Sequence, residues 1–295
     1  MRTLLNIITF LLLLAWPGSG WSGNGIPVFV SIVPQKYFVQ QIGAGRVDVH
    51  VMVRPGASPA TYEPKPRQMA DLARARLFFA IGVPFEDRWL DKIAAANPNL
   101  KVIHTDAGIE KHPISDHLHE KATEAHGATH VAHDGFDPHI WLAPDLVEHQ
   151  ARSISAALQQ IDPSHATVYE TNFQRFAAQI DTLDAELNQA FAGKQGRRFM
   201  VFHPSWGYFA RAYGLTQVPV EIDGKTPKPA QLKQLIELAK AEDIRIIFVQ
   251  PQFSTKSANL VAKAIGGDVV AADPLAADWP GNLRRVADQF KAALR

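Results

Sequence analysis

The sequence predicts an α/β protein of two α/β lobes, each with a parallel-type sheet, joined by a long rigid backbone helix. Short apolar runs alternate with helical patterns between residues 26 and 103, an order typical of parallel sheets flanked by helices. The same alternation returns from residue 199 to the end of the chain. Between the two halves, apolar residues recur at helical spacing: Tyr169, Phe173, Phe176, Ile180, Leu183, Leu187 and Phe191.

The first half is expected to contain strands at residues 28–33, 47–53, 77–81 and 101–103, with helices at 37–42, 68–75 and 89–96. The second half is expected to contain strands at 199–202, 218–222, 244–249 and 269–271, with helices at 206–213, 229–241, 257–265 and 283–294.

A helix at 144–160 precedes the long central helix. Asp162 suits an N-cap and Pro163 a first helical turn, so the long helix is expected to start there. The helical spacing of apolar residues continues to Gly193, which gives a helix of about 45 Å. We therefore assign residues 24–160 to an N-terminal lobe, 161–193 to the linking helix and 194–295 to a C-terminal lobe.

Residues 1–23 resemble a signal peptide. Arg2 is followed by an apolar run from Leu4 to Trp16 and then by small residues suited to cleavage. The alternative is a membrane anchor, but the run is short for a membrane span. The chain has no cysteine, which excludes disulfides, thiolate metal ligands and a lipid anchor on a cleavage-site cysteine. We expect an exported periplasmic protein without a lipid anchor.

The formal net charge of the 295-residue chain is +1 at pH 7, and no strongly basic segment is present. This balance argues against a nucleic-acid partner. The segment from 111 to 136 is polar and rich in histidine, which is typical of a long flexible loop that collects metal ions weakly. Its histidines are His112, His117, His119, His126, His130 and His133.

Three residues are candidate metal ligands, because each is expected to lie near the end of a strand. Neighbouring proline and apolar residues also hold the first of them in place. His139 lies in an Asp-Pro-His-Ile-Trp segment, His203 closes an apolar strand, and Asp273 follows the strand at 269–271. Ligands bind outside the carboxyl ends of strands in open α/β sheets. Each residue taken alone has an ordinary structural explanation, a packed histidine or a turn aspartate. Together, two imidazoles and one carboxylate suit Zn(II), and also Mn(II) or Fe(II).

Several segments, in order, resemble the periplasmic zinc- and manganese-binding proteins of ABC importers, the ZnuA/TroA-like cluster A-I solute-binding family. The resemblance covers nearly all of the chain after the signal peptide. The matching segments are PGASPATYEPKP from Pro55, DPHIWLAP from Asp137, YETNFQRFAAQIDTLD from Tyr169, FHPSWGYFARAYGL from Phe202, VQPQFS from Val249 and ADPL ending at Leu275.

The resemblance implies two α/β lobes joined by a rigid helix, with the metal buried between them. It implies that His139, His203 and Asp273 are ligands, that the His-rich loop belongs to zinc members, and that the partner is a membrane permease of an ABC importer. The protein is expected to be a monomer, and a periplasmic metallochaperone is a further candidate partner.

One family ligand is missing, because Ala60 stands where the family places a histidine. Three explanations remain open. Glu63 would supply a second carboxylate and favour manganese or iron, His104 or a loop histidine would replace the missing imidazole, or water would fill the position.

Other functions remain as alternatives. A zinc-dependent hydrolase would use three ligands, a bound water and Glu63 as general base, but no H-E-x-x-H or G-x-S-x-G motif is present. An adhesin, a metal buffer, or a paralogue that lost tight binding with its first histidine are further alternatives. We expect a binding protein rather than an enzyme.

Overall fold

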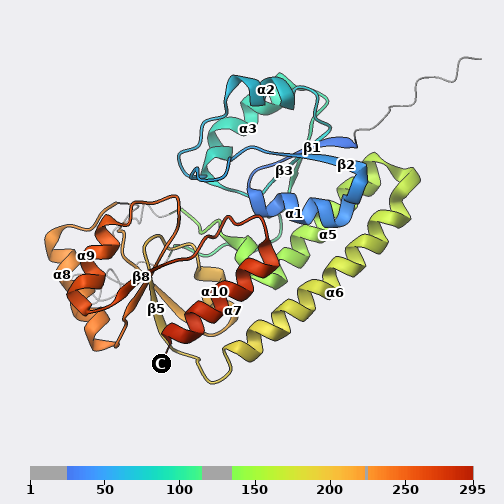
Figure 1. Ribbon diagram of the computed structural model, residues 1–295. Coiled ribbons are helices and arrows are strands. Elements are labelled where there is room, and N and C mark those ends of the chain that lie inside the picture. The colour runs from blue at the N-terminus through green and yellow to red at the C-terminus, as the bar shows by residue number, and fades with distance from the viewer. Residues whose placement is uncertain (1–24, 115–134, 223–224, 295) are drawn as a thin grey trace, which may run out of the picture.

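Two parallel sheets of four strands form the two halves of the computed structural model, which describes residues 25–114, 135–222 and 225–294 (Figure 1). The first sheet has the order β2-β1-β3-β4 and the second the order β6-β5-β7-β8. Their strands are β1 (Ile26–Val30), β2 (Val47–Val51), β3 (Leu77–Ala80), β4 (Lys101–His104), β5 (Arg198–Val201), β6 (Thr216–Pro219), β7 (Ile246–Val249) and β8 (Asp268–Ala271).

All eight predicted strands are present, and most of their bounds shift by one to three residues. The predicted fold class is therefore confirmed. In both sheets the strand order reverses beside the first strand of that half, between β1 and β3 and between β5 and β7. Open α/β sheets bind ligands at the carboxyl ends of strands flanking such a point.

The described helices are α1 (Val33–Gly43), α2 (Pro66–Leu72), α3 (Pro84–Ala96), α5 (Pro144–Ile161), α6 (Ala166–Ala190), α7 (Gly207–Ala212), α8 (Pro229–Ala241), α9 (Lys256–Ile265) and α10 (Trp279–Ala293). Many carry proline in their first turn, where the missing N–H has no helical partner to lose. Short 3₁₀ turns occupy Ala44–Arg46, Ile140–Leu142 and Pro163–His165.

The central helix α6 is shorter than predicted. Its 25 residues correspond to about 38 Å, because Pro163–His165 form a separate 3₁₀ turn and the chain leaves the helix at Phe191. Gly193 follows with a φ of 75°, a left-handed conformation that ends the helical path. Asp162 stands at the predicted N-cap position, but of the 3₁₀ turn, and its side chain makes no capping bond. Its carboxylate instead accepts hydrogen bonds from the side chains of Ser164, His165 and Tyr169.

Helices cover both sheets. In the first half, α1 and α5 pack on one side of the sheet, and Figure 1 shows α2 and α3 on the other. In the second half, Leu235 of α8 and Val261 of α9 pack against one face through Met200 and Ile247. On the opposite face, Phe290 of α10 contacts Phe199 and Phe248, each with ring centroids 4.3 Å apart. Alternate residues of β5 thus face different helices, as strand geometry requires.

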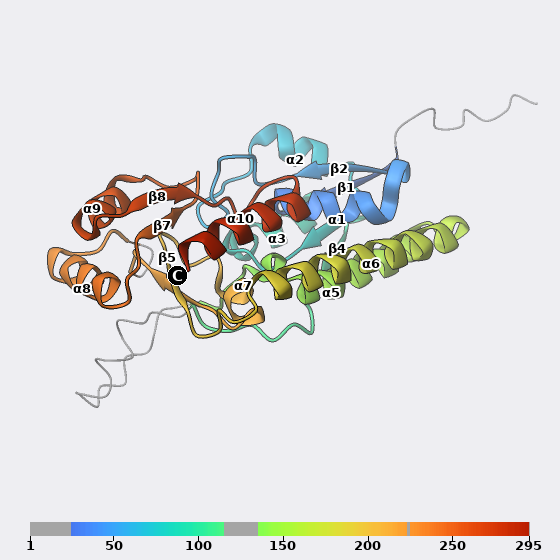
Figure 2. The ribbon, with the colours of Figure 1, turned by 60° about the horizontal axis from the view of Figure 1, so that its bottom comes forward.

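The two halves are joined by more than one helix. Figures 1 and 2 show α6 running beside α5 and reaching α10. At the start of α10, the indole of Trp279 packs edge-on against Phe38 of α1, with centroids 5.2 Å apart, and lies near Phe176 of α6. The C-terminal helix therefore packs against the first half, a connection that the sequence pattern did not indicate. The exact lobe boundaries stay predictions.

Among the helices that the structure describes, none combines the length and the apolar character needed to cross a membrane.

Replacing Trp279 by alanine is expected to lower the free energy of unfolding by about 3–5 kcal/mol, because the side chain is 2% exposed and leaves a cavity between the halves. Urea denaturation followed by far-UV circular dichroism measures the change. The control Leu260→Ala, at a 56% exposed residue of α9, should stay within about 0.5 kcal/mol of wild type. Equal stabilities of the two variants would contradict the role given to Trp279.

Candidate metal-binding site

A cavity of about 230 Å³ lies between the two halves, at the carboxyl ends of their strands. Val83 and Pro84 line it just beyond β3, and His203 lines it just beyond β5. Residues after β7 and β8 complete the wall of the second half: Gln252, Phe253, Pro274 and Leu275. The cavity thus occupies the position where open α/β sheets bind their ligands.

His139 enters the cavity from the first half. Its side chain and backbone both contact Asp137: Nδ1 lies 2.6 Å from Oδ1, and the backbone N–H donates to the same oxygen at 2.9 Å. An ionised carboxylate only accepts hydrogen bonds, so Nδ1 carries the proton and Nε2 keeps its lone pair. The residue is 8% exposed, and burial lowers the pKa of His139 against the opposing effect of Asp137. The His139 ring is therefore neutral, and its Nε2 lone pair is available to a metal ion.

His203 enters from the second half in the same manner. Its Nδ1 lies 2.5 Å from Oε1 of Glu221, a carboxylate that is 6% exposed. The ring stacks on Phe253 with centroids 4.8 Å apart, and Gln250 donates to the backbone carbonyl of His203 at 2.7 Å. The rings of His139 and His203 have centroids 5.3 Å apart. Both rings thus show the carboxylate–imidazole pairing that metal-binding histidines use.

Asp273 lies at the edge of this arrangement. Its Oδ1 accepts hydrogen bonds from the Leu275 backbone N–H at 2.9 Å and from Gln252 Nε2 at 3.1 Å. The residue that follows it, Pro274, lines the cavity, and its carbonyl accepts a hydrogen bond from the Trp141 indole at 2.7 Å. Within residues 25–114, 135–222 and 225–294, no three histidine, aspartate or glutamate side chains lie close enough to hold one metal ion. The three-ligand set therefore stays a prediction.

None of the other predicted ligands that the structure describes lines the cavity. Ala60 lines the cavity, whereas Glu63 is exposed and does not. The side chain of His104 is 56% exposed and lies 3.8 Å from Asp106. His112 is half-buried, and its ring packs near Tyr208 with centroids 5.7 Å apart. The remaining loop histidines lie outside the described residues: His117, His119, His126, His130 and His133.

A buried glutamate holds one wall of the cavity. Glu86, in the first turn of α3, accepts hydrogen bonds from the Ser31 hydroxyl and from the backbone N–H groups of Ile81 and Gly82, the last at 2.8 Å. Burial raises the pKa of Glu86 to about 7, against the effect of these hydrogen bonds. Because these bonds anchor the turn after β3, they position Val83 and Pro84 at the cavity.

Sequence reasoning missed the role of Glu221 and treated Asp137 only as part of a motif. A usable signal existed for Glu221. Its carboxylate interrupts the apolar segment Val218–Ile222, and a buried carboxylate needs a partner. What the pattern does not contain is the identity of that partner, because His203 lies 18 residues away in the chain.

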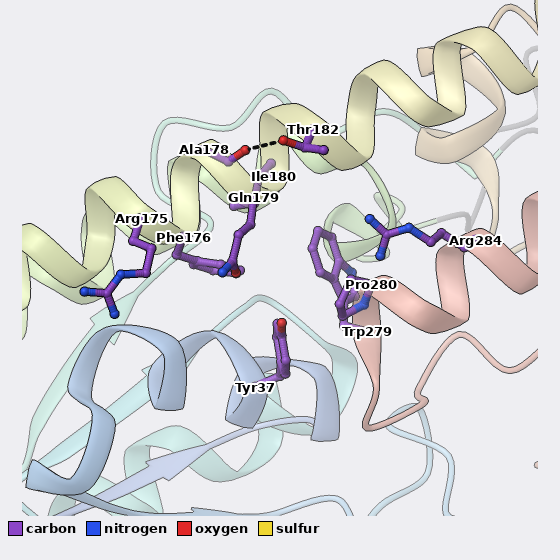
Figure 3. A pocket seen from close by; sticks show the side chains of 10 residues that line it. All are labelled: Tyr37, Arg175, Phe176, Ala178, Gln179, Ile180, Thr182, Trp279, Pro280 and Arg284. Carbon is purple, nitrogen blue, oxygen red and sulfur yellow. Dashed lines mark hydrogen bonds between the residues drawn. The ribbon is translucent and has the colours of Figure 1, made fainter.

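A second and larger cavity, of about 530 Å³, lies where α1, α6 and α10 meet (Figure 3). Aromatic rings and two guanidinium groups dominate its walls. They come from Tyr37, Phe176, Trp279, Arg175 and Arg284. No histidine, aspartate or glutamate belongs to its described lining, so this cavity does not suit a metal cation.

Comparison with known proteins agrees with this geometry. Residues 28–293 match the family model described as ZnuA, zinc-uptake complex component A, periplasmic. The high-affinity zinc uptake system protein ZnuA of Bacillus subtilis (strain 168) is 27% identical over 83% of this chain and 76% of its own length. The zinc-binding lipoprotein AdcA of Streptococcus pneumoniae R6 is 25% identical over 92% of this chain, which spans 54% of that longer protein.

Two solved structures are also similar. A crystal structure of ZnuA superposes with a TM-score of 0.84 at 42% identity, covering 92% of this chain and all of the other. A zinc-bound deletion mutant of ZnuA superposes with a TM-score of 0.82 at 42% identity, covering 92% of this chain and 98% of the other. The resemblance expected from the sequence motifs is confirmed. The match over nearly the whole chain means that this protein belongs to the ZnuA family of periplasmic zinc-uptake components.

Proposed function

We propose that this chain captures Zn(II) between its two halves with His139 and His203, with Asp273 as a third ligand, and delivers it to the permease of an ABC importer. The observation that carries the proposal is the pair of imidazoles, one from each half, whose Nδ1 atoms face buried carboxylates. This arrangement leaves both Nε2 atoms available to one ion. Membership of the zinc-uptake family supports the same function.

The donor set favours zinc over manganese or iron. Two neutral imidazoles are borderline ligands, which bind Zn(II) well, whereas Mn(II) prefers carboxylate and carbonyl oxygens. The exposed position of Glu63 adds no carboxylate to the cavity. Transport requires binding and release of the ion, so the proposed function includes no chemical step on a substrate.

Membership of the family also supports export of this protein to the periplasm. The family consists of metal-binding transport components described as periplasmic. We propose that residues 1–23 act as a cleaved signal peptide. The chain carries no cysteine to which a lipid could be attached. The same proposal includes a monomeric protein that meets its permease at the membrane surface and has a periplasmic metallochaperone as a further partner.

Replacing His139 by alanine is expected to abolish the tight zinc site, because one of the two paired imidazoles is removed. Calorimetric titration of zinc into a variant lacking residues 115–134 separates this site from weaker binding by the His-rich loop. The matched control is His50→Ala, since His50 is exposed and pairs with Asp48 away from the cavity. Absence of a tight site in the parent protein, or unchanged affinity in His139→Ala, would show that the site is misassigned.

Replacing Glu221 by glutamine is expected to weaken zinc binding by about 10–100-fold, because the amide orients the His203 ring but raises its basicity less than a carboxylate does. The control Glu237→Gln changes a 65% exposed carboxylate of α8 and should leave the affinity unchanged. Equal affinities for both variants would mean that Glu221 does not tune His203.

Zinc affinity is expected to fall as the pH drops below about 6, because protons and zinc compete for the same imidazole lone pairs. Zinc binds to neutral imidazole, so binding is lost as protonation of the ligands increases at lower pH. Since burial lowers the pKa of His139, this ring stays neutral to more acidic pH than an exposed histidine. Competition titrations between about pH 7 and about pH 5 test this, and constant affinity over that range would contradict it.

A further inference from the structure

The backbone beside His139 is held by a tyrosine of the opposite half. Tyr208, in α7 of the second half, is 5% exposed, and its hydroxyl donates to the Asp137 carbonyl at 3.1 Å. The same hydroxyl accepts the His112 backbone N–H at 3.1 Å, so it acts as donor and acceptor at once. The Asp137 N–H in turn donates to the His112 carbonyl at 2.7 Å. Tyr208 therefore fixes the Asp137 backbone both directly and through His112.

The Asp137 side chain determines how the His139 ring is oriented. Its Oδ1 lies 2.6 Å from Nδ1 of His139 and accepts the His139 backbone N–H at 2.9 Å. Asp137 is 4% exposed, so water offers the ring little alternative support. A histidine that binds a metal depends on such a partner for its orientation. A displacement of Asp137 would therefore move the Nε2 atom that we assign to the metal.

Gly207 leaves the room that the Asp137 carboxylate occupies. A Cβ atom built on Gly207 would lie 2.7 Å from Oδ2 of Asp137 and 3.0 Å from Nε2 of Gln217. The first distance is well inside ordinary van der Waals contact. Gly207 does not have a positive φ, so its backbone conformation alone does not require glycine. What requires it is the close approach of a carboxylate from the first half.

The start of α7 is also fastened to the chain that carries His203. Residues 204–206 connect His203 to Gly207, and Gln217 holds both ends of this connection. The Gln217 Oε1 accepts the Trp206 backbone N–H at 3.0 Å, and its Nε2 donates to the Pro204 carbonyl at 3.3 Å. The residues that contact Asp137 therefore follow His203 on one hydrogen-bonded segment. The contact between this segment and Asp137 relates the two candidate ligands across the junction of the halves.

We propose that Gly207 and Tyr208 are positioning residues for the metal site, which hold Asp137 against the His139 ring from the opposite half of the protein. Neither residue touches the metal in this arrangement. The inference rests on the proposed zinc-binding function and adds the residues by which the second half sets the geometry of the first-half ligand.

Tyr208→Phe removes only the hydroxyl that holds Asp137. In the full protein this change is expected to weaken zinc binding by about 10-fold, at the lower end of the range for groups that orient a ligand. Competition against a chromophoric zinc chelator measures the affinity. The matched control is Tyr213→Phe, because Tyr213 is 4% exposed, follows the same helix and donates to Asp184 at 2.8 Å, away from the site.

The control separates positioning from folding. Both tyrosine variants lose one hydrogen bond of a buried tyrosine, so both should lose stability in urea denaturation, whereas only Tyr208→Phe should lose zinc affinity. The visible spectrum of one equivalent of Co(II), bound in place of zinc, should change in Tyr208→Phe and stay as in wild type in Tyr213→Phe. Equal zinc affinities and equal Co(II) spectra in the two variants would overturn the inference.

Gly207→Ala tests the close approach itself. The added methyl group should displace the Asp137 carboxylate and weaken zinc binding by about 10–100-fold. Gly45→Ala is the matched control, because a Cβ atom at Gly45 meets nothing within 4 Å and its φ is not positive. Zinc affinity in Gly207→Ala equal to that in Gly45→Ala would contradict the role of Gly207. The tyrosine pair decides by itself if alanine at 207 prevents folding.

A double-mutant cycle tests whether Tyr208 acts through Asp137. In the Asp137→Ala background no carboxylate remains to be positioned, so adding Tyr208→Phe should cause no further loss of zinc affinity. An undiminished, additive loss would overturn the inference. The wild-type titration tests the proposed function separately. If wild type binds no zinc tightly, that function fails, whereas tight binding by wild type and equally tight binding by Tyr208→Phe would overturn the positioning role alone.

Discussion

Two indole hydrogen bonds determine how the halves of this protein face each other. The Trp141 Nε1–H donates to the Pro274 carbonyl at 2.7 Å, and the Trp279 Nε1–H donates to the Trp141 carbonyl at 2.7 Å. Both bonds are buried and join segments more than 130 residues apart in the chain. Since Trp141 also packs against His139, with centroids 5.1 Å apart, the junction between the halves and the candidate metal site share one side chain. Breaking either bond would leave buried polar groups without partners, which is costly.

Each candidate histidine is paired with a carboxylate of its own half. His139 and Asp137 belong to one half, and His203 and Glu221 belong to the other. The carboxylates fix the tautomer and the orientation of each ring locally. The position of one ring relative to the other depends on how the halves pack, because the two rings come from different halves.

Around Ala60, the described wall of the candidate site is poor in metal-ligating side chains. Ala60 offers no donor atom, and the neighbouring Glu63 is exposed rather than turned into the cavity. The result is a site with two well-prepared imidazoles, a carboxylate at its edge and a mostly apolar space beside them.

The sequence by itself determined the local features of this protein. Apolar periodicity predicted eight strands and a long central helix, a strand end pointed to His203, and the Asp-Pro-His-Ile-Trp segment pointed to His139. These signals depend on residues close together in the chain. Only the tertiary structure decided the rest: the pairing of His203 with Glu221, the packing of Trp279 on α1, and the exclusion of Glu63 from the cavity. These contacts join segments distant in the sequence, and a pattern of spacing carries no information about which distant surfaces meet when the halves pack.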